Sequence, residues 1–319
     1  YYSPTGRLLA VACGLVVQVF DVETWAVRST LRGHAQRVHS ISFDSTGERI
    51  ITTSSDGSVR VWNACGGELI TPLLGHESPT VAARLLPALE AGEPRAISAD
   101  GSSRVRTWNL GANGPVLTSS ADDKSTFITQ ISFAADVSAV RAVGQSMVIT
   151  IDLRDRPHVT SRTPLPPGFL NVIPGKDLVL RNYANQTLAL ESLADWSKRW
   201  TLTDEPFYQF VVSPDGSLAA VFRDKSQLSI LRMADGVELG RTHADPTGYH
   251  RPVFSPDCTV LATIANSGVL RLWDANDGAL KVQLAGEGER AFGLCWSNDG
   301  GLLAYAHARE GVTVLNMRT

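Results

Sequence analysis

The chain has 319 residues, of which 43% are hydrophobic and 19% charged, with 29 Lys and Arg against 32 Asp and Glu. This length can bury one large β domain or two ordinary ones. The net charge of −3 argues against nucleic acid as a partner, because phosphate binding needs a concentrated basic surface. No run of about 18 apolar residues occurs, which argues against a membrane-spanning helix.

The four cysteines are far apart and form no Cys-x-x-Cys pair; they are Cys13, Cys65, Cys258 and Cys295. In a chain of this length they indicate buried, reduced thiols of a cytoplasmic protein rather than disulfides or a zinc site. The chain begins with Tyr1 and not with Met, and no secretory signal precedes it. We therefore expect a fragment of a longer protein.

A polar turn of the type Ser-Pro-Asp-Gly, followed by an apolar strand, recurs along the chain at 3–6, 44–47, 213–216, 255–258 and 297–300. The last residues of consecutive turns lie 41 or 42 residues apart, and the gap of 169 residues from Gly47 to Gly216 divides into four units of about 42. A second marker is a strand that ends in an apolar and a polar residue, and it occurs at 20–21, 62–63, 108–109, 151–152, 190–191, 231–232, 273–274 and 315–316. Both markers count eight units of one repeat.

Within the units the apolar pattern has the period of a β-strand, as in Val59 and Val61, which alternate with Arg60 and Trp62. Each unit accommodates four short strands, and a lone four-stranded sheet cannot cover its own faces. Packing successive sheets radially covers them. We therefore predict an all-β propeller of eight blades, each a four-stranded antiparallel sheet, or seven if the degenerate unit 167–206 is miscounted. The approximate blades are 1–37, 38–80, 81–127, 128–166, 167–206, 207–249, 250–290 and 291–319.

One unit carries the full pattern, which is Gly33-His34, then Val38–Phe43, then Ile50 to Asp56-Gly57, then Val59-Arg60-Val61-Trp62-Asn63. It resembles the WD repeat, and the resemblance extends over essentially the whole chain. It is sharp in the units ending at Trp62, Trp108 and Trp273 and weak in those ending at Ile151, Leu190 and Leu231. In WD-like propellers each unit runs from an inner to an outermost strand, so the unit 291–319 lacks its outer strand. Related rings close with a strand from the opposite terminus, and we expect a segment upstream of Tyr1 to supply it.

The WD resemblance implies a structural role for His34, Ser54, Asp56 and Trp62, as a buried chain of hydrogen bonds from indole to hydroxyl to His to Asp. Thr52 is the alternative hydroxyl, because it lies on the same strand face as Ser54. The next unit repeats the set with His76, Ser98, Asp100 and Trp108. Ser, His and Asp together also suggest a hydrolase, but no Gly-x-Ser-x-Gly elbow accompanies them.

Other polar groups carry weaker signals. The carboxylates Asp122, Asp123, Glu287 and Glu289 lack the ligand density of a calcium loop, and the histidines in loops lack metal-binding spacing. We therefore expect no metal and no cofactor.

In a WD-like propeller, the loops from one blade to the next and the turns between second and third strands lie on one face, around the central channel. Arginines and aromatic residues there are candidates for partner binding, because these residue types dominate interface hot spots. The candidates are Arg37, Arg104, Phe207, Tyr208, Arg223, Tyr249, His250, Arg251 and Arg290, with Glu77 beside them. Phe207 and Tyr208 can equally be core residues of an inner strand.

The sequence thus favours a non-catalytic scaffold or sensor domain that binds a protein or peptide. The resemblance places it in a larger cytoplasmic signalling protein, such as a signal-transduction ATPase or a kinase. The alternative is a propeller enzyme with its site in the central channel, but the apolar inner strands offer few catalytic side chains.

Overall fold

The computed structural model describes residues 1–86, 95–102, 104–111, 116–121, 128–133, 139–144, 147–152, 158–164, 168–173, 176–183, 186–193, 195–203, 207, 209–223, 227–243, 252–286, 291–307 and 311–318. All regular elements in these residues are β-strands, so the all-β prediction is confirmed. None of these segments forms a helix with the length and hydropathy that crossing a membrane requires. The chain divides into two compact units, Tyr1–Pro166 and Pro167–Thr319.

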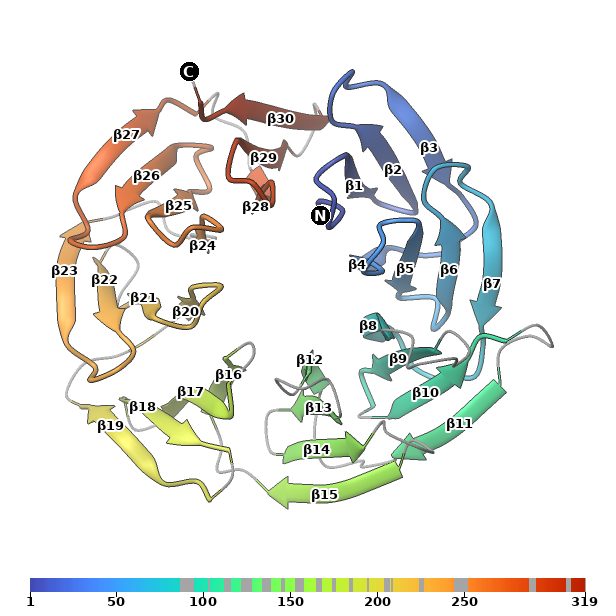
Figure 1. The fold of residues 1–319 in the computed structure, drawn as a ribbon, viewed down its shortest axis with the longest axis horizontal. Coiled ribbons are helices and arrows are strands. Elements are labelled where there is room, and N and C mark those ends of the chain that lie inside the picture. Colours follow the sequence, from blue (N-terminus) through green and yellow to red (C-terminus); the bar gives the residue numbers. More distant parts are fainter. Residues whose placement is uncertain are drawn as a thin grey trace. The chain divides into compact units, whose positions relative to one another are not determined.

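The first unit contains four antiparallel sheets, in each of which neighbouring strands follow one another in the sequence (Figure 1). The first sheet has three strands, and Tyr2 adds a single bridge to Leu9 at its edge. The strands are β1 (Leu8–Cys13), β2 (Val16–Asp21) and β3 (Val27–Leu31); β4 (Val38–Phe43), β5 (Arg49–Ser54), β6 (Val59–Asn63) and β7 (Leu69–Leu73); β8 (Thr80–Leu86), β9 (Arg95–Asp100), β10 (Val105–Asn109) and β11 (Val116–Ala121); β12 (Ile128–Phe133), β13 (Ala139–Gly144), β14 (Met147–Asp152) and β15 (His158–Pro164).

The second unit contains three sheets of four strands and one of three, again in sequence order. The degenerate segment 167–206 also forms a four-stranded sheet, β16–β19. The strands are β16 (Gly168–Val172), β17 (Leu178–Tyr183), β18 (Thr187–Ser192) and β19 (Lys198–Leu202); β20 (Gln209–Val212), β21 (Leu218–Phe222), β22 (Gln227–Arg232) and β23 (Glu238–His243); β24 (Val253–Phe254), β25 (Val260–Ile264), β26 (Leu270–Asp274) and β27 (Leu280–Leu284); β28 (Ala291–Trp296), β29 (Leu302–His307) and β30 (Gly311–Asn316).

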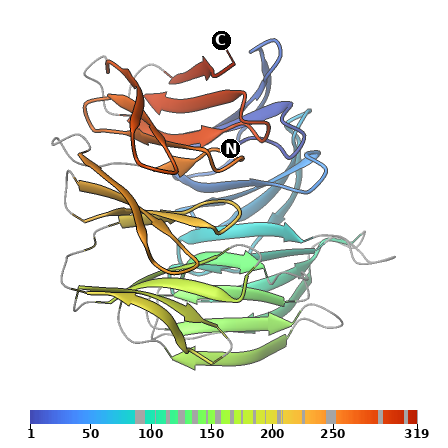
Figure 2. The same cartoon turned by 60° about the vertical axis from the view of Figure 1, so that its left-hand side comes forward.

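Alternation along the strands lets each sheet present apolar side chains to both of its neighbours. In β6, Trp62 packs into a core cluster with Leu8, Val17 and other residues of β1–β3. Val59 and Val61 of the same strand pack on the opposite face with residues of the next sheet, such as Trp108. Successive sheets in the first unit therefore stack face to face (Figure 2). Full burial of each aliphatic side chain contributes about 1.5–3 kcal/mol.

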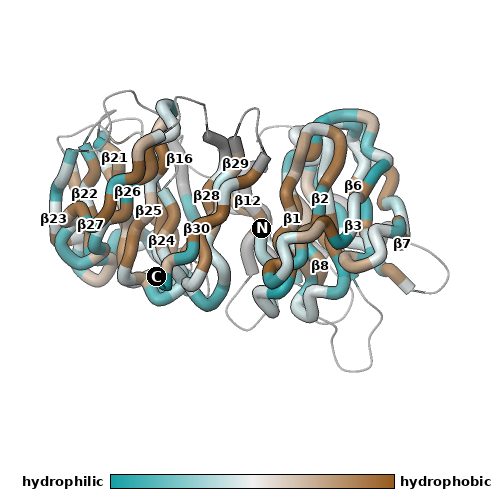
Figure 3. Tube along the Cα trace, turned by 90° about the horizontal axis from the view of Figure 1, so that it is seen from above, coloured by the Kyte–Doolittle hydropathy of each residue, from teal (hydrophilic) through white to brown (hydrophobic). Residues whose placement is uncertain are grey.

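The second unit is built by the same rule. Its three apolar clusters each combine residues of two successive sheets, for example Leu228 and Ile230 with Leu261 and Trp273. In Figure 3 the strands of this unit are largely hydrophobic, whereas polar residues gather at many of the turns. The repeated apolar strands of the sequence thus become the layers of a continuous core within each unit.

The Ser-Pro-Asp-Gly signature forms the turn between the first two strands of a sheet. The Ser213 hydroxyl donates to Asp215 at 2.6 Å and accepts from the backbone N–H of Leu218 at 2.9 Å. Ser255 and Ser297 make the same pair of bonds in the following sheets. The fourth residue of the turn has a left-handed backbone, which glycine adopts without steric cost. It is Gly6, Gly47, Gly216 or Gly300 in four of these turns, but Cys258, with φ of 61°, in a fifth.

The cysteines, all within the described part of the chain, form no disulfide. The expectation that all four are buried is wrong, because Cys13 and Cys65 are exposed and Cys258 and Cys295 are half-buried. Cys13 ends β1 and Cys65 follows β6, so both lie at turns, where the sheets leave side chains uncovered.

The left-handed backbone at Cys258 predicts that Cys258→Gly stabilises the chain. This conformation costs a residue with a Cβ about 1–2 kcal/mol, and replacement by glycine removes that cost. Glycine also has more conformational freedom in the unfolded state, which offsets part of the stabilisation. We expect a net gain of about 1 kcal/mol in the free energy of unfolding, measured by urea denaturation.

Gly300 provides the matched control at the same place in the next turn, with φ of 69°. A Cβ at Gly300 would meet only Pro256 Cδ, at 3.8 Å, so Gly300→Ala tests the backbone cost without a clash. It should lose about 1 kcal/mol. A loss of stability in Cys258→Gly would contradict the prediction and assign a stabilising role to the thiol.

Candidate functional site

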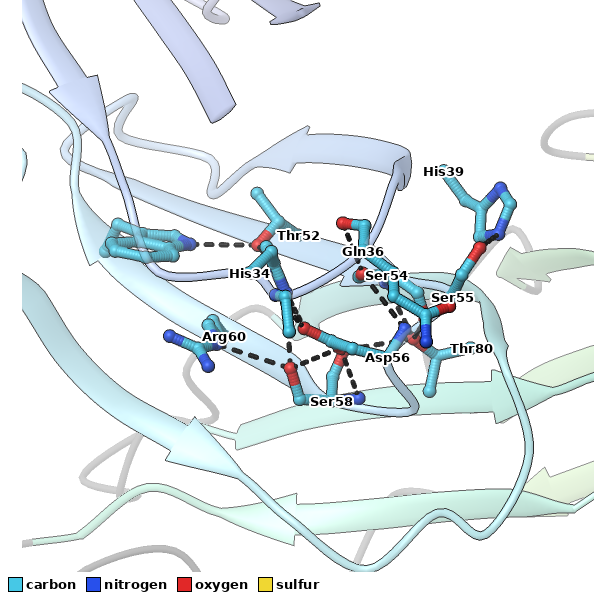
Figure 4. A network of polar contacts seen from close by, with 12 residues as sticks. His34, Gln36, His39, Thr52, Ser54, Ser55, Asp56, Ser58, Arg60 and Thr80 are labelled. Carbon is cyan, nitrogen blue, oxygen red and sulfur yellow. Dashed lines mark hydrogen bonds and ion pairs between the residues drawn. The ribbon is translucent and has the colours of Figure 1, made fainter. Parts of the chain in front are cut away.

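A buried chain of four side chains joins the strands of sheet β4–β7 (Figure 4). The Trp62 indole N–H donates to the Thr52 hydroxyl at 2.9 Å, and that hydroxyl lies 2.7 Å from His34 Nε2. His34 Nδ1 lies 3.0 Å from the Asp56 carboxylate. Because the Asp56 carboxylate can only accept, His34 Nδ1 carries the hydrogen and donates to it, and Nε2 of the neutral ring accepts from the Thr52 hydroxyl.

The charges of this chain follow from its burial. Burial lowers the pKa of His34, and the neighbouring Asp56 carboxylate offsets this only in part, so the imidazole is neutral at neutral pH. Burial raises the pKa of Asp56, but hydrogen bonds from the Ser58 hydroxyl and from the backbone N–H groups of Ser58 and Ala35 outweigh it. The pKa of Asp56 therefore lies well below its ordinary value, and the group is a carboxylate.

The hydroxyl between Trp62 and His34 belongs to Thr52, the alternative, and not to Ser54. Ser54 lies two residues further along β5 and binds backbone instead. Its hydroxyl donates to the Gln36 carbonyl at 2.9 Å and accepts from the Asp56 N–H at 3.1 Å. Ser54 therefore holds the loop before β4 against the turn after β5, outside the indole-to-His chain.

Sheet β8–β11 contains a second chain of the same kind. The Trp108 indole donates to Ser98 at 2.8 Å, Ser98 lies 2.7 Å from His76 Nε2, and His76 Nδ1 lies 2.8 Å from Asp100. Burial raises the pKa of Asp100, but hydrogen bonds from His76 and from the backbone N–H groups of Arg104 and Ser102 lower it by more. The pKa of Asp100 therefore lies below its ordinary value. The four residues expected to act together are thus brought together in this sheet.

A partial version occurs in sheet β24–β27, where the Trp273 indole donates to Thr263 at 2.9 Å. In all three sheets the hydroxyl residue stands ten positions before the tryptophan, as with Thr52 and Trp62. This constant separation is the signal that distinguishes Thr52 from Ser54 in the sequence.

The connectivity of hydroxyl, His and Asp matches that of a hydrolytic triad, but the surroundings do not. The Thr52 and Ser98 side chains are fully buried (0% exposed), so no substrate carbon can approach either oxygen. Each hydroxyl is also occupied by an indole N–H. Neither hydroxyl is therefore available to a substrate, and leaving any one of the polar groups of these chains unpaired would cost about 1–3 kcal/mol.

The two chains fix the backbone at one end of sheets β4–β7 and β8–β11. We define the loop rim as residues 13–16, 32–37, 54–58, 74–79, 100–102 and 104. Asp56 accepts from the Ala35 N–H at 2.9 Å, Ser55 N donates to the Arg37 carbonyl at 2.9 Å, and Gly101 N donates to the Pro79 carbonyl at 2.9 Å. Backbone bonds therefore connect each loop to the turn beside it.

The candidate partner residues divide into three groups. Arg37 is exposed on the loop rim, and Arg104 lies on the rim in an ion pair with Glu77, at 2.6 Å. Phe207 and Arg223 are buried, and the Arg223 guanidinium lies over the Phe207 ring and binds Glu238. The others lie outside the described residues; they are Tyr208, Tyr249, His250, Arg251 and Arg290.

Metal binding finds no support in the described part of the chain, where no three or more His, Cys, Asp or Glu side chains gather in a way that could hold an ion. The acidic candidates Asp122, Asp123, Glu287 and Glu289 lie outside it. The histidines at the two buried chains are engaged with hydroxyl and carboxylate groups.

Comparison with known proteins yields one family match, several relatives and a structural neighbour. The family described as WD domain, G-beta repeat, matches residues 25–63. The target of rapamycin complex subunit wat1 of Schizosaccharomyces pombe is 32% identical over 35% of this chain and 34% of its own length. The U3 small nucleolar RNA-associated protein 21 homolog of the same yeast is 37% identical over 22% of this chain and 8% of its own.

Pre-mRNA-processing factor 19 of Mus musculus is 30% identical over 24% of this chain and 15% of its own. The chain thus matches no more than about a third of the length of each of these three relatives. The solved structure of the C-terminal WD40 domain of Sif2 matches with a TM-score of 0.79 and 16% identity. That match covers 99% of this chain and 94% of the other, and at this identity it shows a common fold.

The buried chain predicts that Trp62→Ala destabilises the protein by about 3–5 kcal/mol, because it removes a fully packed ring and the donor to Thr52. Trp62→Phe keeps most of the ring but removes the N–H, and we expect it to cost about 1–2 kcal/mol. Urea denaturation measures both. An unchanged midpoint for Trp62→Ala would show that the indole does not support the chain.

Proposed function

We propose that the chain is a WD-repeat β-propeller that serves as a non-catalytic interaction platform and binds a protein or peptide at its loop rim. The WD repeat matched at residues 25–63 and the fold shared with the C-terminal WD40 domain of Sif2 support this proposal. We also propose that the eight sheets are the eight blades of one ring, with the boundaries expected from the sequence.

The observation that carries this proposal is that the polar side chains of sheets β4–β7 and β8–β11 bind one another and the loop backbone. Their hydroxyl, His and Asp groups are buried and bound to one another and to loop backbone, as the Thr52 chain illustrates. They rigidify a surface rather than present a reactive group. A rigid rim lowers the entropy that binding must overcome, which suits an interaction surface.

The relatives support the same class of function. Wat1 is named as a subunit of a complex, one other relative as a U3 small nucleolar RNA-associated protein, and a third as a pre-mRNA-processing factor. For this chain we propose a protein or peptide partner, since the net charge of −3 does not favour a polyanion.

We extend the proposal to the parent protein, as the sensor or scaffold domain of a larger cytoplasmic signalling protein such as a signal-transduction ATPase or a kinase. The intact gene product tests this extension directly. A Gly-x-x-x-x-Gly-Lys-Ser/Thr loop or a kinase domain elsewhere in it would support the extension, and the absence of both would refute it.

Two features of the second unit support an upstream strand that completes the last sheet. Within the described residues β30 pairs only with β29, which leaves its other edge open. In the pairing of β26 with β27, Leu284 stands opposite Leu270, and Val282 stands opposite Leu272. Leu270 and Leu272 pack against β28–β30, so Leu284 and Val282 lie on the same face of the sheet. Leu284 and Val282 are nevertheless exposed. A strand added to β30 would cover this apolar stripe and satisfy the open edge.

This proposal predicts that a chain extended upstream of Tyr1 to include the natural preceding residues is more stable than the present one. Leu284 supplies the sharper readout. Leu284→Glu should change the stability of the present chain by less than about 0.5 kcal/mol, because the side chain is 38% exposed. In the extended chain, the same substitution should cost about 2 kcal/mol or more.

Thermal denaturation of the four proteins measures both effects, and hydrogen exchange at the amides of β30 reports the added strand. Equal costs of Leu284→Glu in the short and extended chains would show that no upstream strand covers the stripe.

For the loop rim, we predict that selection from a random peptide library yields peptides that bind this chain saturably. Arg104→Glu, a change on the rim, should lower the affinity for these peptides at least about tenfold. Arg199→Glu, on the exposed strand β19, is the control and should have no effect. Selected peptides that are indifferent to substitutions throughout the loop rim would contradict the proposed site.

A further inference from the structure

Two neighbouring segments of the loop rim and the start of β4 carry three exposed side chains. We call the surface made of Leu15, Arg37 and His39 the cationic corner. Leu15 is 50% exposed in the turn between β1 and β2. Arg37 and His39 are exposed on either side of Val38, which is buried in the core. The pairing of β4 with β5 shifts by one residue between Val38 and Ser40, so His39 lies in a β-bulge, and both polar side chains are exposed while Val38 is buried.

The backbone of this corner is held in place by bonds to two turns. The Val38 N–H donates to the Gly14 carbonyl at 2.9 Å, which ties the start of β4 to the turn that carries Leu15. The Ser55 N–H donates to the Arg37 carbonyl at 2.9 Å, and the Ser55 hydroxyl lies 2.7 Å from His39 Nε2 (Figure 4). Asp56 and the buried Ser54 anchor the same turn to the loop that precedes Arg37. The corner is therefore built before any ligand arrives.

The positive charge of the corner is not neutralised by the described part of the chain. Arg37 has no ion pair there, whereas Arg104, in the turn between β9 and β10 of the next sheet, is paired with Glu77. The carboxylate of Asp56 is nearby in the fold, but it is engaged with His34, Ser58 and Ala35. In the tautomer whose Nε2 accepts from the Ser55 hydroxyl, His39 carries its hydrogen on Nδ1 and can donate it to a ligand.

We propose that the cationic corner binds an acidic segment of the partner protein. A carboxylate of that segment pairs with the Arg37 guanidinium, which matches its planar geometry, and accepts a hydrogen bond from His39. An apolar side chain beside the carboxylate covers Leu15. This inference rests on the proposed function, because it names the chemistry of the partner at the same rim.

Fluorescence anisotropy with three matched labelled peptides tests the proposal on the whole chain. The peptides are short repeats of Gly-Leu-Glu, Gly-Leu-Gln and Gly-Leu-Lys, which differ only in charge. We expect the Glu peptide to bind about tenfold tighter than the Gln peptide and to weaken as salt is added. The Lys peptide should not bind.

Variants locate the effect. Arg37→Gln should lose about tenfold in affinity for the Glu peptide, and His39→Ala and Leu15→Ser should each lose several-fold. Arg37→Glu should reverse the preference, binding the Lys peptide and not the Glu peptide. Arg199→Gln is the matched control, because Arg199 is an exposed arginine on β19, and it should leave the affinity unchanged. Unchanged melting temperatures confirm that the variants are folded.

The results separate this inference from the proposed function. If peptides selected from the random library bind and depend on Arg104 but not on Arg37, the platform function stands and the cationic corner is wrong. Equal affinity of the wild type for the Glu and Gln peptides would also overturn the inference. So would tighter binding of a single-stranded RNA oligonucleotide than of the Glu peptide, because the ligand would then be a polyanion of another class.

Discussion

Each sheet of this protein has two apolar faces and too few residues to cover either of them. Each sheet therefore depends on its two neighbours to cover its apolar faces. Because successive side chains of a strand point to opposite faces, one strand supplies apolar side chains to both neighbouring sheets. Trp62 and Val61 are adjacent in β6, yet they belong to different clusters on opposite faces of the sheet. A slip of one residue in strand register would exchange the two faces and expose both clusters. The clusters between sheets therefore fix register as well as stability.

Polar groups buried between the layers are paired in ways that differ from sheet to sheet. Sheets β4–β7 and β8–β11 use Trp, hydroxyl, His and Asp. In sheet β16–β19 the guanidinium of Arg181 lies 3.3 Å from the Glu191 carboxylate, and both residues are almost fully buried. In sheet β20–β23 Arg223 binds Ser229 and Glu238. Apolar packing is thus common to every sheet, and the polar arrangement is local.

The turns that lead into the last strand of a sheet contain one left-handed position, and different residue types occupy it in different sheets. Gly67, Gly236 and Gly278 occupy this position in three sheets, whereas Trp25 and Trp196 occupy it in two others, each with φ of 58°. A side chain there costs about 1–2 kcal/mol. The Trp196 ring lies 4.9 Å from the Arg181 guanidinium, and this cation–π contact offsets part of that cost.

Repeat length, strand period and turn chemistry were readable in the sequence because they depend on residues close together in the chain, and the all-β fold and the resemblance to the WD repeat followed from them. The identity of the buried hydroxyl did not follow from the strand pattern, because Thr52 and Ser54 share a strand face. The indole of Trp62 identifies Thr52 in the structure, and the separation of ten residues, repeated in three sheets, is the corresponding signal in the sequence. Nor could the pattern tell that Phe207 and Arg223 are covered while Arg37 is exposed. Their burial depends on partners such as Glu238 on another strand, and only tertiary packing brings these together.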